Sequence, residues 1–303
     1  MPRIKKRKRI FDPRVWPTWL LLGLVWLLVR LPLSVLYRLG HLLGAIVYRF
    51  GRSRRHITDV NLSLCFPDQD TATRDALSRA SFHHTALGAL ETMMVWLNPR
   101  RDVCAATTLH GVEHLREAVA QGRGVVLLGG HFTAMDIIAS ALKPLDIDVI
   151  YRENKNPLWE WLQVSGRRRF FDGVIERENT REILRRLKSG RAIWYAADQD
   201  YGRKHSVFAP FFGVQAATIN ATARLARFNQ SPVVFMSHFR NLETRTWSVH
   251  FHPRLENFPT GDDVGDATRI NGILEDAIRQ HPEQYLWMHR RFKTRPEGEP
   301  GLY

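Results

Sequence analysis

The chain has 303 residues, a formal net charge of +14 at pH 7, a pI near 10.3, two cysteines and a mean hydropathy of −0.28. This hydropathy excludes a protein built from many membrane-spanning helices, and two cysteines cannot form a disulfide framework. So positive a charge indicates an anionic partner, such as a nucleic acid, an anionic lipid or a phosphorylated substrate.

The first segment of the chain combines basic residues with a long apolar stretch. Seven of the 44 lysines and arginines lie within residues 3–14, and residues 15–29 are apolar apart from Thr18. A basic flank before an apolar stretch that contains tryptophans is typical of membrane attachment. A second apolar stretch, residues 31–48, is also followed by arginines, which favours an in-plane or re-entrant anchor over a single span. A buried core helix is the alternative.

We therefore predict a basic N-terminus with a membrane anchor over residues 1–48 and a catalytic domain over residues 49–303. In the second part the pattern predicts a long helix over residues 71–97 and then an alternation of strands and helices. Buried strands are predicted near residues 124–128, 146–151, 192–197, 232–238 and 247–252. Further helices are predicted from Asn156-Pro157, from Asn179 to Gly190, and up to Pro282. The predicted fold is α/β, with a mostly parallel central sheet flanked by helices and an N-terminal apolar helical membrane anchor.

The main candidate for chemistry directly follows the strand predicted at residues 124–128. Gly129 and Gly130, which would let a substrate approach the backbone closely, lead into His131, and Asp136 stands five positions further on. On one continuous helix the two side chains would point about 140° apart, so pairing requires His131 before a helix and Asp136 about one turn into it. Asp136 would then fix the imidazole tautomer, and the other ring nitrogen would take a proton. The alternative is a turn histidine bonded to a backbone group.

Arginines gather between two of the predicted strands. A run from Arg167 to Arg169 has Arg152 upstream and Arg177 downstream. Because a guanidinium group can bind phosphate or carboxylate through two parallel hydrogen bonds, we predict that these arginines contact an anionic substrate. A solvated helix face is the alternative reading of such a charge run.

Two acids, Asp198 and Asp200, follow the strand predicted at residues 192–197, at the sheet edge expected to carry His131. No third metal ligand accompanies them, and neither a metal nor an organic cofactor is expected. They are predicted to bind the sugar hydroxyls of a substrate or to anchor a loop. Near the C-terminus, residues 285–296 interleave aromatic and cationic side chains. This segment would suit a nucleic acid, an anionic headgroup or an acidic carrier protein, or would pack its aromatics in the core.

Taken together, these segments resemble the lipid A biosynthesis acyltransferases, of the lauroyltransferase type that adds secondary acyl chains to a Kdo-bearing lipid A precursor. The likeness covers most of the chain. It is carried in order by Asn61-Leu62, Cys65-Phe66-Pro67, His131 with Asp136, Tyr151-Arg152, Asn156-Pro157, Gly166 to Arg169, Trp194-Tyr195, Asp198 to Gly202, Ala216-Ala217-Thr218 and residues 282–298.

The resemblance implies a fold like that of glycerolipid acyltransferases and a reaction at the cytoplasmic face of the inner membrane of a Gram-negative bacterium. The implied partners are acyl–acyl carrier protein as donor, a phosphorylated lipid A precursor as acceptor and inner-membrane lipids, with no nucleic acid. It implies that His131, oriented by Asp136, deprotonates the hydroxyl of a 3-hydroxyacyl chain on the precursor. That hydroxyl would attack the thioester without a covalent acyl-enzyme, and the arginines would meet the phosphates or Kdo carboxylates of the precursor.

Other functions stay open at this point. A glycerolipid or lysophospholipid acyltransferase would share the His131 and Asp136 pattern but would acylate glycerol 3-phosphate or a lysophospholipid. A thioesterase would use water in place of the acceptor. A non-enzymatic anionic-lipid-binding protein would explain the charge, and its binding should survive the loss of His131.

Overall fold

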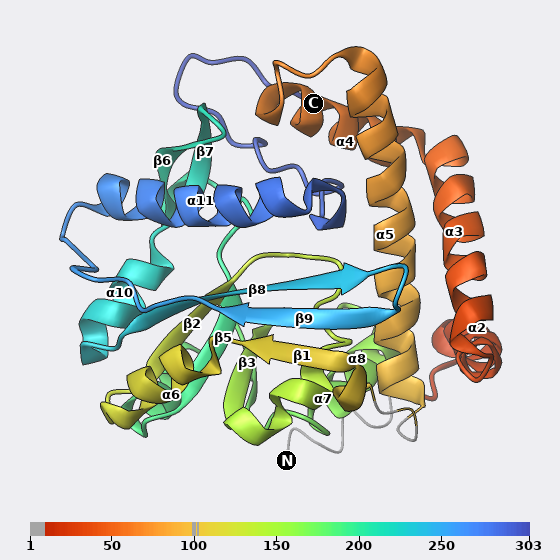
Figure 1. Ribbon diagram of the computed structural model, residues 1–303, viewed down its shortest axis with the longest axis horizontal. Coiled ribbons are helices and arrows are strands. Elements are labelled where there is room, and N and C mark those ends of the chain that lie inside the picture. The colour runs from red at the N-terminus through yellow and green to blue at the C-terminus, as the bar shows by residue number, and fades with distance from the viewer. Residues whose placement is uncertain (1–9, 99–100, 102) are drawn as a thin grey trace.

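The computed structural model describes residues 10–98, 101 and 103–303, so the basic residues 3–9 of the predicted N-terminal flank lie outside the described part. Its centre is a seven-stranded sheet in the order β1-β9-β8-β2-β5-β3-β4 (Figure 1). The strands are β1 Thr107–His110, β2 Val125–Gly129, β3 Ile147–Tyr151, β4 Val174–Glu176, β5 Ala192–Ala196, β8 Val233–Asn241 and β9 Thr246–Phe251. A separate antiparallel hairpin joins β6 Ser206–Phe211 to β7 Val214–Ile219.

The predicted α/β fold with a mostly parallel central sheet flanked by helices is confirmed. Strands β8, β2, β5, β3 and β4 run parallel to one another, whereas β9 is antiparallel to β8 and pairs in parallel with β1. The central strand β2 is buried along its whole length, which explains its unbroken apolar sequence. All five predicted strands are present.

Helices flank this sheet, and four of the described α-helices begin at a side chain that accepts a hydrogen bond from a free backbone N–H group of the first turn. Asn156 and Asn179 accept hydrogen bonds at the starts of α8 and α9, as the sequence predicts, and Asp70 does the same at the start of α5. The α-helices are α2 Trp16–Leu28, α3 Leu33–Phe50, α4 Arg52–Cys65, α5 Thr71–Leu97, α6 Val112–Ala120, α7 Ala139–Leu142, α8 Pro157–Arg167, α9 Thr180–Lys188, α10 Ala221–Asn229 and α11 Asp263–Gln280. Short 3-10 helices are η1 Pro13–Val15, η2 Cys104–Ala106, η3 Lys143–Leu145, η4 Arg203–His205 and η5 Pro282–Gln284.

The sheet separates two apolar cores. One face contributes Leu127 and Met236 to a core shared with α5, α6, α7 and α8. The other face contributes Leu128 and Phe235 to a core shared with α9, α10 and α11, and Figure 1 shows α11 on the opposite side of the sheet from α6 and α7. With both faces covered, the open edge at the carboxyl ends of the parallel strands is the place where this kind of fold binds ligands.

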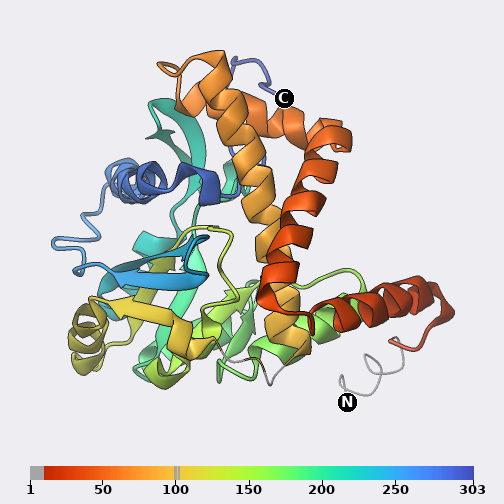
Figure 2. The same ribbon diagram turned by 45° about the vertical axis from the view of Figure 1, so that its right-hand side comes forward.

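The predicted N-terminal apolar helical membrane anchor is wrong. Pro32 divides the apolar region into two helices, and α2 has only 13 residues, which rise about 20 Å against a hydrocarbon core of about 30 Å. Helix α3 packs along α5 and carries Arg38 and Arg49, while α2 extends from the body of the protein (Figure 2). Within the described residues, no helix combines the length and the apolar character needed to cross a bilayer.

The division between residues 1–48 and 49–303 stays a prediction. In the structure α3 continues through residue 48 and ends at Phe50.

Candidate active site

His131 lies in the loop that follows β2, at the carboxyl edge of the parallel strands. The C-terminal segment of the chain holds this loop from one side, because Leu286 N donates to the His131 carbonyl at 3.1 Å and Thr133 N donates to the Gln284 carbonyl at 2.8 Å. Residues far apart in the sequence thus fix the backbone on both sides of the histidine.

The two glycines before His131 make room for protein side chains. A Cβ at Gly129 would lie 2.5 Å from Trp194 Nε1, and a Cβ at Gly130 would lie 2.5 Å from Leu274 Cδ1. Real Cβ atoms do not approach other heavy atoms so closely, so larger residues would push β5 or α11 away. Packing against Trp194 and Leu274 therefore favours glycine at both positions.

His131 pairs with Asp198. Its Nδ1 lies 2.6 Å from Asp198 Oδ1, and its main-chain N donates to Asp198 Oδ2 at 2.9 Å. The sheet register explains the pairing, because β2 and β5 are parallel neighbours with Gly129 opposite Ala196, and each of the two residues lies two positions further on. The side chain of Asp198 is 2% exposed and that of His131 is 25% exposed.

Electrostatics keep Asp198 ionised. Burial opposes ionisation of Asp198, but the adjacent imidazole and the hydrogen bonds from His131 outweigh burial and hold the carboxyl pKa well below its usual range. Asp198 is therefore a carboxylate at neutral pH and accepts a proton-bearing Nδ1. In a neutral imidazole with this tautomer, the other ring nitrogen, Nε2, is the acceptor; it lies 3.1 Å from Gln199 Nε2 at the pocket.

Asp136, which the sequence predicts as the partner of His131, is bound to Arg167 instead. Arg167 donates from Nε to Asp136 Oδ1 at 2.8 Å and from Nη2 to Oδ2 at 3.0 Å. The difference arises because residues 131–138 form a series of turns and the next helix, α7, begins only at Ala139. Asp136 therefore does not stand one turn into a helix facing the imidazole. Burial alone would lower the Arg167 pKa, but Asp136 raises it overall, so the guanidinium stays charged.

The structure separates the four predicted substrate-binding arginines into two groups. Arg152, Arg167 and Arg177 line a pocket that also contains His131. Arg169 does not line this pocket, because it donates to the carbonyls of Val95 and Trp96 near the end of α5. Its contacts are those of a structural residue that satisfies the last carbonyls of a helix.

Asp200 is buried and acts within a loop. Its carboxylate accepts from Gly202 N at 2.8 Å and from Thr294 N and Oγ1 at 2.6 and 2.8 Å. Of the two roles predicted for this acid, the contacts are those of a loop anchor, which joins the loop after β5 to the C-terminal segment. In the described part of the chain, no group of three or more histidines, cysteines or acids is placed to hold a metal ion.

The pocket at His131 has a volume of about 1200 Å³, which is large enough for a lipid chain together with polar groups. Its polar side contains His131, Asp136, Arg152, Arg167, Arg177 and Gln199. Its apolar side contains Met135, Ile183, Leu184, Trp194, Leu225 and Phe228. One cavity is therefore lined by the imidazole of His131, by several cations and by apolar side chains, some of which belong to α9 and α10.

A family model described as bacterial lipid A biosynthesis acyltransferase matches residues 3–294, which is nearly the whole chain. The chain belongs to this family. It is therefore an acyltransferase, and its acceptor belongs to lipid A biosynthesis. The resemblance that the motifs carry is confirmed.

Individual relatives agree with this assignment of the lipid A acyltransferase. The chain is 39% identical to the lipid A biosynthesis lauroyltransferase of Escherichia coli K12 over 296 residues, 97% of each chain. It is also 39% identical to the lipid A biosynthesis palmitoleoyltransferase of the same organism, over 100% of this chain and 99% of that one. A lipid A biosynthesis acyltransferase of Haemophilus influenzae is 32% identical over 96% of this chain and 95% of its own length.

The C-terminal segment of this lipid A acyltransferase packs its aromatic residues in the core. Trp287 and Phe292 are fully buried, and the buried Arg291 donates to the Ala217 carbonyl and to Thr218 Oγ1. Of the readings left open for residues 285–296, the structure shows core packing for these side chains, and not a free cationic surface.

Two residues near His131 are not predicted as site residues from the sequence. Tyr285 is buried, and its hydroxyl lies beside the carboxylate of Asp198. Burial lowers the pKa of His289 to about 4, although the nearby carboxylate of Asp198 acts in the opposite direction. Both residues lie in the C-terminal segment, residues 285–296, whose aromatic and cationic pattern is evident in the sequence. Only the fold shows that this segment packs against the loop of His131. His289 Nε2 accepts from Asp200 N at 3.3 Å, so it too belongs to the support of the loop after β5.

Proposed function

We propose that this enzyme transfers a fatty acyl chain from acyl–acyl carrier protein to the hydroxyl of a 3-hydroxyacyl chain on a phosphorylated, Kdo-bearing lipid A precursor. The reaction would take place at the cytoplasmic face of the inner membrane. The printed names of the relatives, a lauroyltransferase and a palmitoleoyltransferase, support a fatty acyl group as the part that is moved. The apolar side chains that line the pocket at His131 support the same substrate class.

The observation that carries the proposal is the orientation of His131. Its Nδ1 is bound by the ionised Asp198 and its Nε2 lies at the pocket. A neutral imidazole held in this tautomer is suited to remove a proton from an alcohol at neutral pH. Asp198 thus takes the orienting role that the sequence assigned to Asp136, and it stabilises the imidazolium that forms.

The chemical steps follow from this geometry. Nε2 of His131 takes the proton of the acceptor hydroxyl while its oxygen forms a bond to the thioester carbonyl carbon. The carbon–sulfur bond of the tetrahedral intermediate then breaks, and the proton on Nε2 passes to the departing thiolate sulfur. In this scheme the acyl group passes directly from the thioester sulfur to the acceptor oxygen, without a covalent acyl-enzyme.

Arg167 has a part in this scheme that depends on Asp136. The carboxylate occupies Nε and Nη2 of the guanidinium, and Arg167 lines the same pocket as His131. A fixed positive charge in a partly buried site stabilises the negative charge that develops on the carbonyl oxygen during attack. Asp136 is then a positioning residue for Arg167, and not a partner of the base.

Arg152 and Arg177 are the cations proposed to contact the acceptor. Both line the pocket, and Arg177 lies over the ring of Tyr201 at 5.2 Å. Their forked guanidinium groups suit the phosphates or Kdo carboxylates of the precursor.

A transfer assay tests this function. Purified protein is incubated with the phosphorylated Kdo-lipid A precursor and a panel of acyl–acyl carrier protein thioesters, and products are read by mass spectrometry. The expected product is the precursor with one added acyl chain. Acylation of glycerol 3-phosphate without acylation of the precursor would contradict the proposed acceptor.

A further inference from the structure

Helices α9 and α10 lie side by side and carry cations on their outer faces. The exposed cations are Arg181, Arg185, Lys188, Arg224 and Arg227, which we call the α9–α10 surface. The two helices contain a single acid, Glu182. Lys188 of α9 lies over the ring of Phe228 of α10 at 5.0 Å, which joins the helices at this surface.

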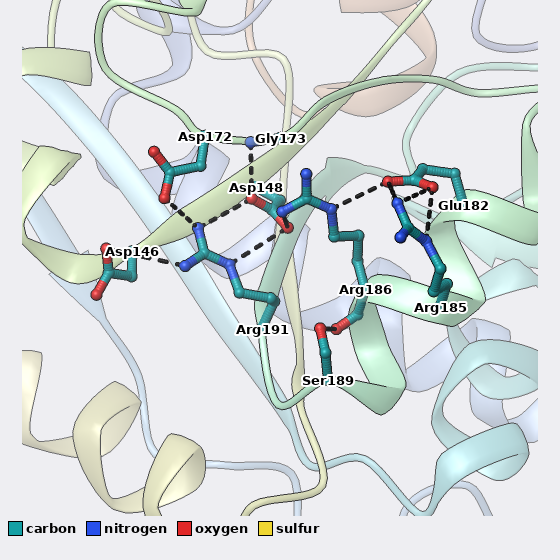
Figure 3. Close-up of polar contacts among 9 residues, drawn as sticks. All are labelled: Asp146, Asp148, Asp172, Gly173, Glu182, Arg185, Arg186, Ser189 and Arg191. Atoms are coloured by element: carbon teal, nitrogen blue, oxygen red, sulfur yellow. Dashed lines mark hydrogen bonds and ion pairs between the residues drawn. The ribbon is translucent and has the colours of Figure 1, made fainter.

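Internal ion pairs account for part of the charge of α9 (Figure 3). Arg186 contacts the buried carboxylate of Asp148 at 3.5 Å and Glu182 at 3.0 Å, and Arg185 donates to the same Glu182. Arg191 also holds Asp148, at 3.0 Å. These contacts fix α9 on the sheet from its inner side, so its position does not depend on the outward cations.

Of the other four cations of the α9–α10 surface, three form no ion pair with the described residues, and the fourth forms only a solvent-exposed pair. Within the described residues, no ion pair is formed by Arg181, Lys188 or Arg224. Arg227 is 3.8 Å from Asp263, and both side chains of that pair are largely exposed, so solvent screens it. The surface therefore presents cations whose charges the protein itself leaves uncompensated.

The pocket at His131 reaches this surface. Arg224, Arg227 and Phe228 of α10 line the same cavity as His131, together with Ile183 of α9. Phe228 is 46% exposed. The lining of one cavity therefore includes the proposed base, residues of both helices, two cations of the α9–α10 surface and an exposed aromatic ring.

We propose that the α9–α10 surface docks the acidic carrier protein that delivers the acyl thioester, and that the carrier's pantetheine arm enters the pocket between α9 and α10. This inference rests on the proposed function, in which the donor is bound to such a carrier. Uncompensated cations attract an acidic protein and speed its encounter, and the cavity that residues of α9 and α10 share with His131 would receive a thin arm that carries the thioester. A lipid surface fits less well, because Phe228 is the one large apolar side chain exposed among the residues described for α9 and α10.

Two double variants test the docking surface. Arg181→Ala/Lys188→Ala removes two cations of the surface, and Arg116→Ala/Arg254→Ala removes two exposed cations elsewhere, on α6 and after β9, so the net charge changes equally. Steady-state kinetics are measured with acyl–acyl carrier protein and the lipid A precursor. Binding of the carrier is measured separately by fluorescence anisotropy.

The surface double variant is expected to raise the KM for the acyl carrier about 5- to 20-fold at low salt, with kcat and the KM for the lipid acceptor within twofold of wild type. In wild type this KM should rise with added sodium chloride, and in the surface variant it should rise less. The control double variant should behave as wild type, and thermal midpoints should agree for all three proteins.

Equal donor KM values and equal carrier binding in the two double variants would overturn the docking surface while leaving the proposed function in place. Reduced binding to anionic vesicles with an unchanged donor KM would assign the surface to lipid and overturn the inference as well. Absence of transfer from any carrier thioester by wild type would instead contradict the proposed function itself.

Discussion

Asp198 binds His131 twice, through Nδ1 of the ring at 2.6 Å and through the main-chain N at 2.9 Å. The two contacts use both carboxylate oxygens, so the acid fixes the loop and the ring together. Because β2 and β5 are parallel neighbours in register, this geometry is set by the sheet and not by the residues that follow His131 in the sequence. The carboxylate is nearly inaccessible to solvent, which strengthens its interaction with the imidazole.

Replacing the orienting acid should remove most of the activity. Asp198→Asn presents a neutral amide to Nδ1 and favours the tautomer with the proton on Nε2, which cannot act as a base. We expect kcat to fall about 10³- to 10⁴-fold, by analogy with the loss of the orienting acid in hydrolase triads. The same change at the exposed Asp146, which precedes β3, is the control and should leave kcat within twofold. A kcat for Asp198→Asn within threefold of wild type would show that the pair is structural.

The pair of Asp136 and Arg167 should be measurable as an energetic coupling. Asp136→Asn leaves a largely buried guanidinium without its counter-charge, and we expect a loss of about 3 kcal/mol in the free energy of unfolding. Arg167→Gln should cost a similar amount, and the double variant should cost less than the sum. Urea unfolding of the three variants gives the coupling energy. A coupling near zero would mean that Asp136 has another main partner, such as the imidazole predicted from the sequence.

The sequence was sufficient for the strands and helices near the site but not for the pairing of its side chains. Local patterns located β2, β5, α5 and α9, because continuous apolar runs and caps depend on neighbouring residues. The partner of His131 depends on which strands are adjacent, and the order β8-β2-β5-β3 cannot be read from local pattern. The sequence places Asp198 at the correct sheet edge, but proximity in the chain favours Asp136 as the partner of His131.

The prediction of an N-terminal membrane anchor fails for a different reason. Composition alone cannot distinguish a membrane anchor from helices that pack partly against the protein, and both give an apolar run with aromatic residues. In the structure Asn156 Nδ2 donates to Thr18 Oγ1 at 3.1 Å, and the rings of Trp19 and Trp161 are 6.4 Å apart. These contacts join α2 to α8, which is distant in sequence, so no local signal predicts them.

The close contact between α5 and the loop that carries His131 should make both stability and activity sensitive to one added methyl group. A Cβ at Gly88 would lie 2.1 Å from the carbonyl oxygen of Thr133, so Gly88→Ala must move α5 or the loop that carries His131. We expect a loss of about 1–3 kcal/mol in the free energy of unfolding and at least a tenfold loss of kcat. Urea unfolding and the transfer assay measure the two effects.

Gly272 in α11 is the matched control, because an added Cβ there meets no atom within 4 Å. Gly272→Ala should leave kcat unchanged and raise the free energy of unfolding by about 0.5–1 kcal/mol, since alanine favours the helix. Equal effects of the two substitutions would show that the close approach at Gly88 does not restrain the loop.

Buried His238 should make stability depend on pH. Burial first, and then the charge of Arg240, lowers the pKa of His238 to about 3, against about 6.5 in the unfolded chain. Between these values the unfolded chain binds a proton that the folded chain does not, so this contribution is complete above pH 6.5 and is lost as the pH falls. Neither ring nitrogen has a hydrogen-bond partner among the described residues, and the neighbouring rings are those of Phe132 and Trp194.

His238→Phe should therefore reduce the loss of stability between pH 7.5 and pH 5.0 by about 2 kcal/mol relative to wild type. Urea unfolding at the two pH values measures this difference. His56→Phe, at an exposed position on α4, should keep the full pH dependence of wild type. Identical pH dependence in wild type and His238→Phe would mean that His238 is protonated in the folded enzyme.

The central claim is that the imidazole of His131 is the base for acyl transfer to the lipid A precursor. Its most direct test is a single-turnover reaction of acyl–acyl carrier protein with the Kdo-bearing precursor, read by mass spectrometry for wild type and His131→Ala. The account predicts that wild type adds one acyl mass to the precursor and that His131→Ala forms product at least about 10³-fold more slowly, with donor and acceptor binding retained. Product formation by His131→Ala at the wild-type rate would contradict the account.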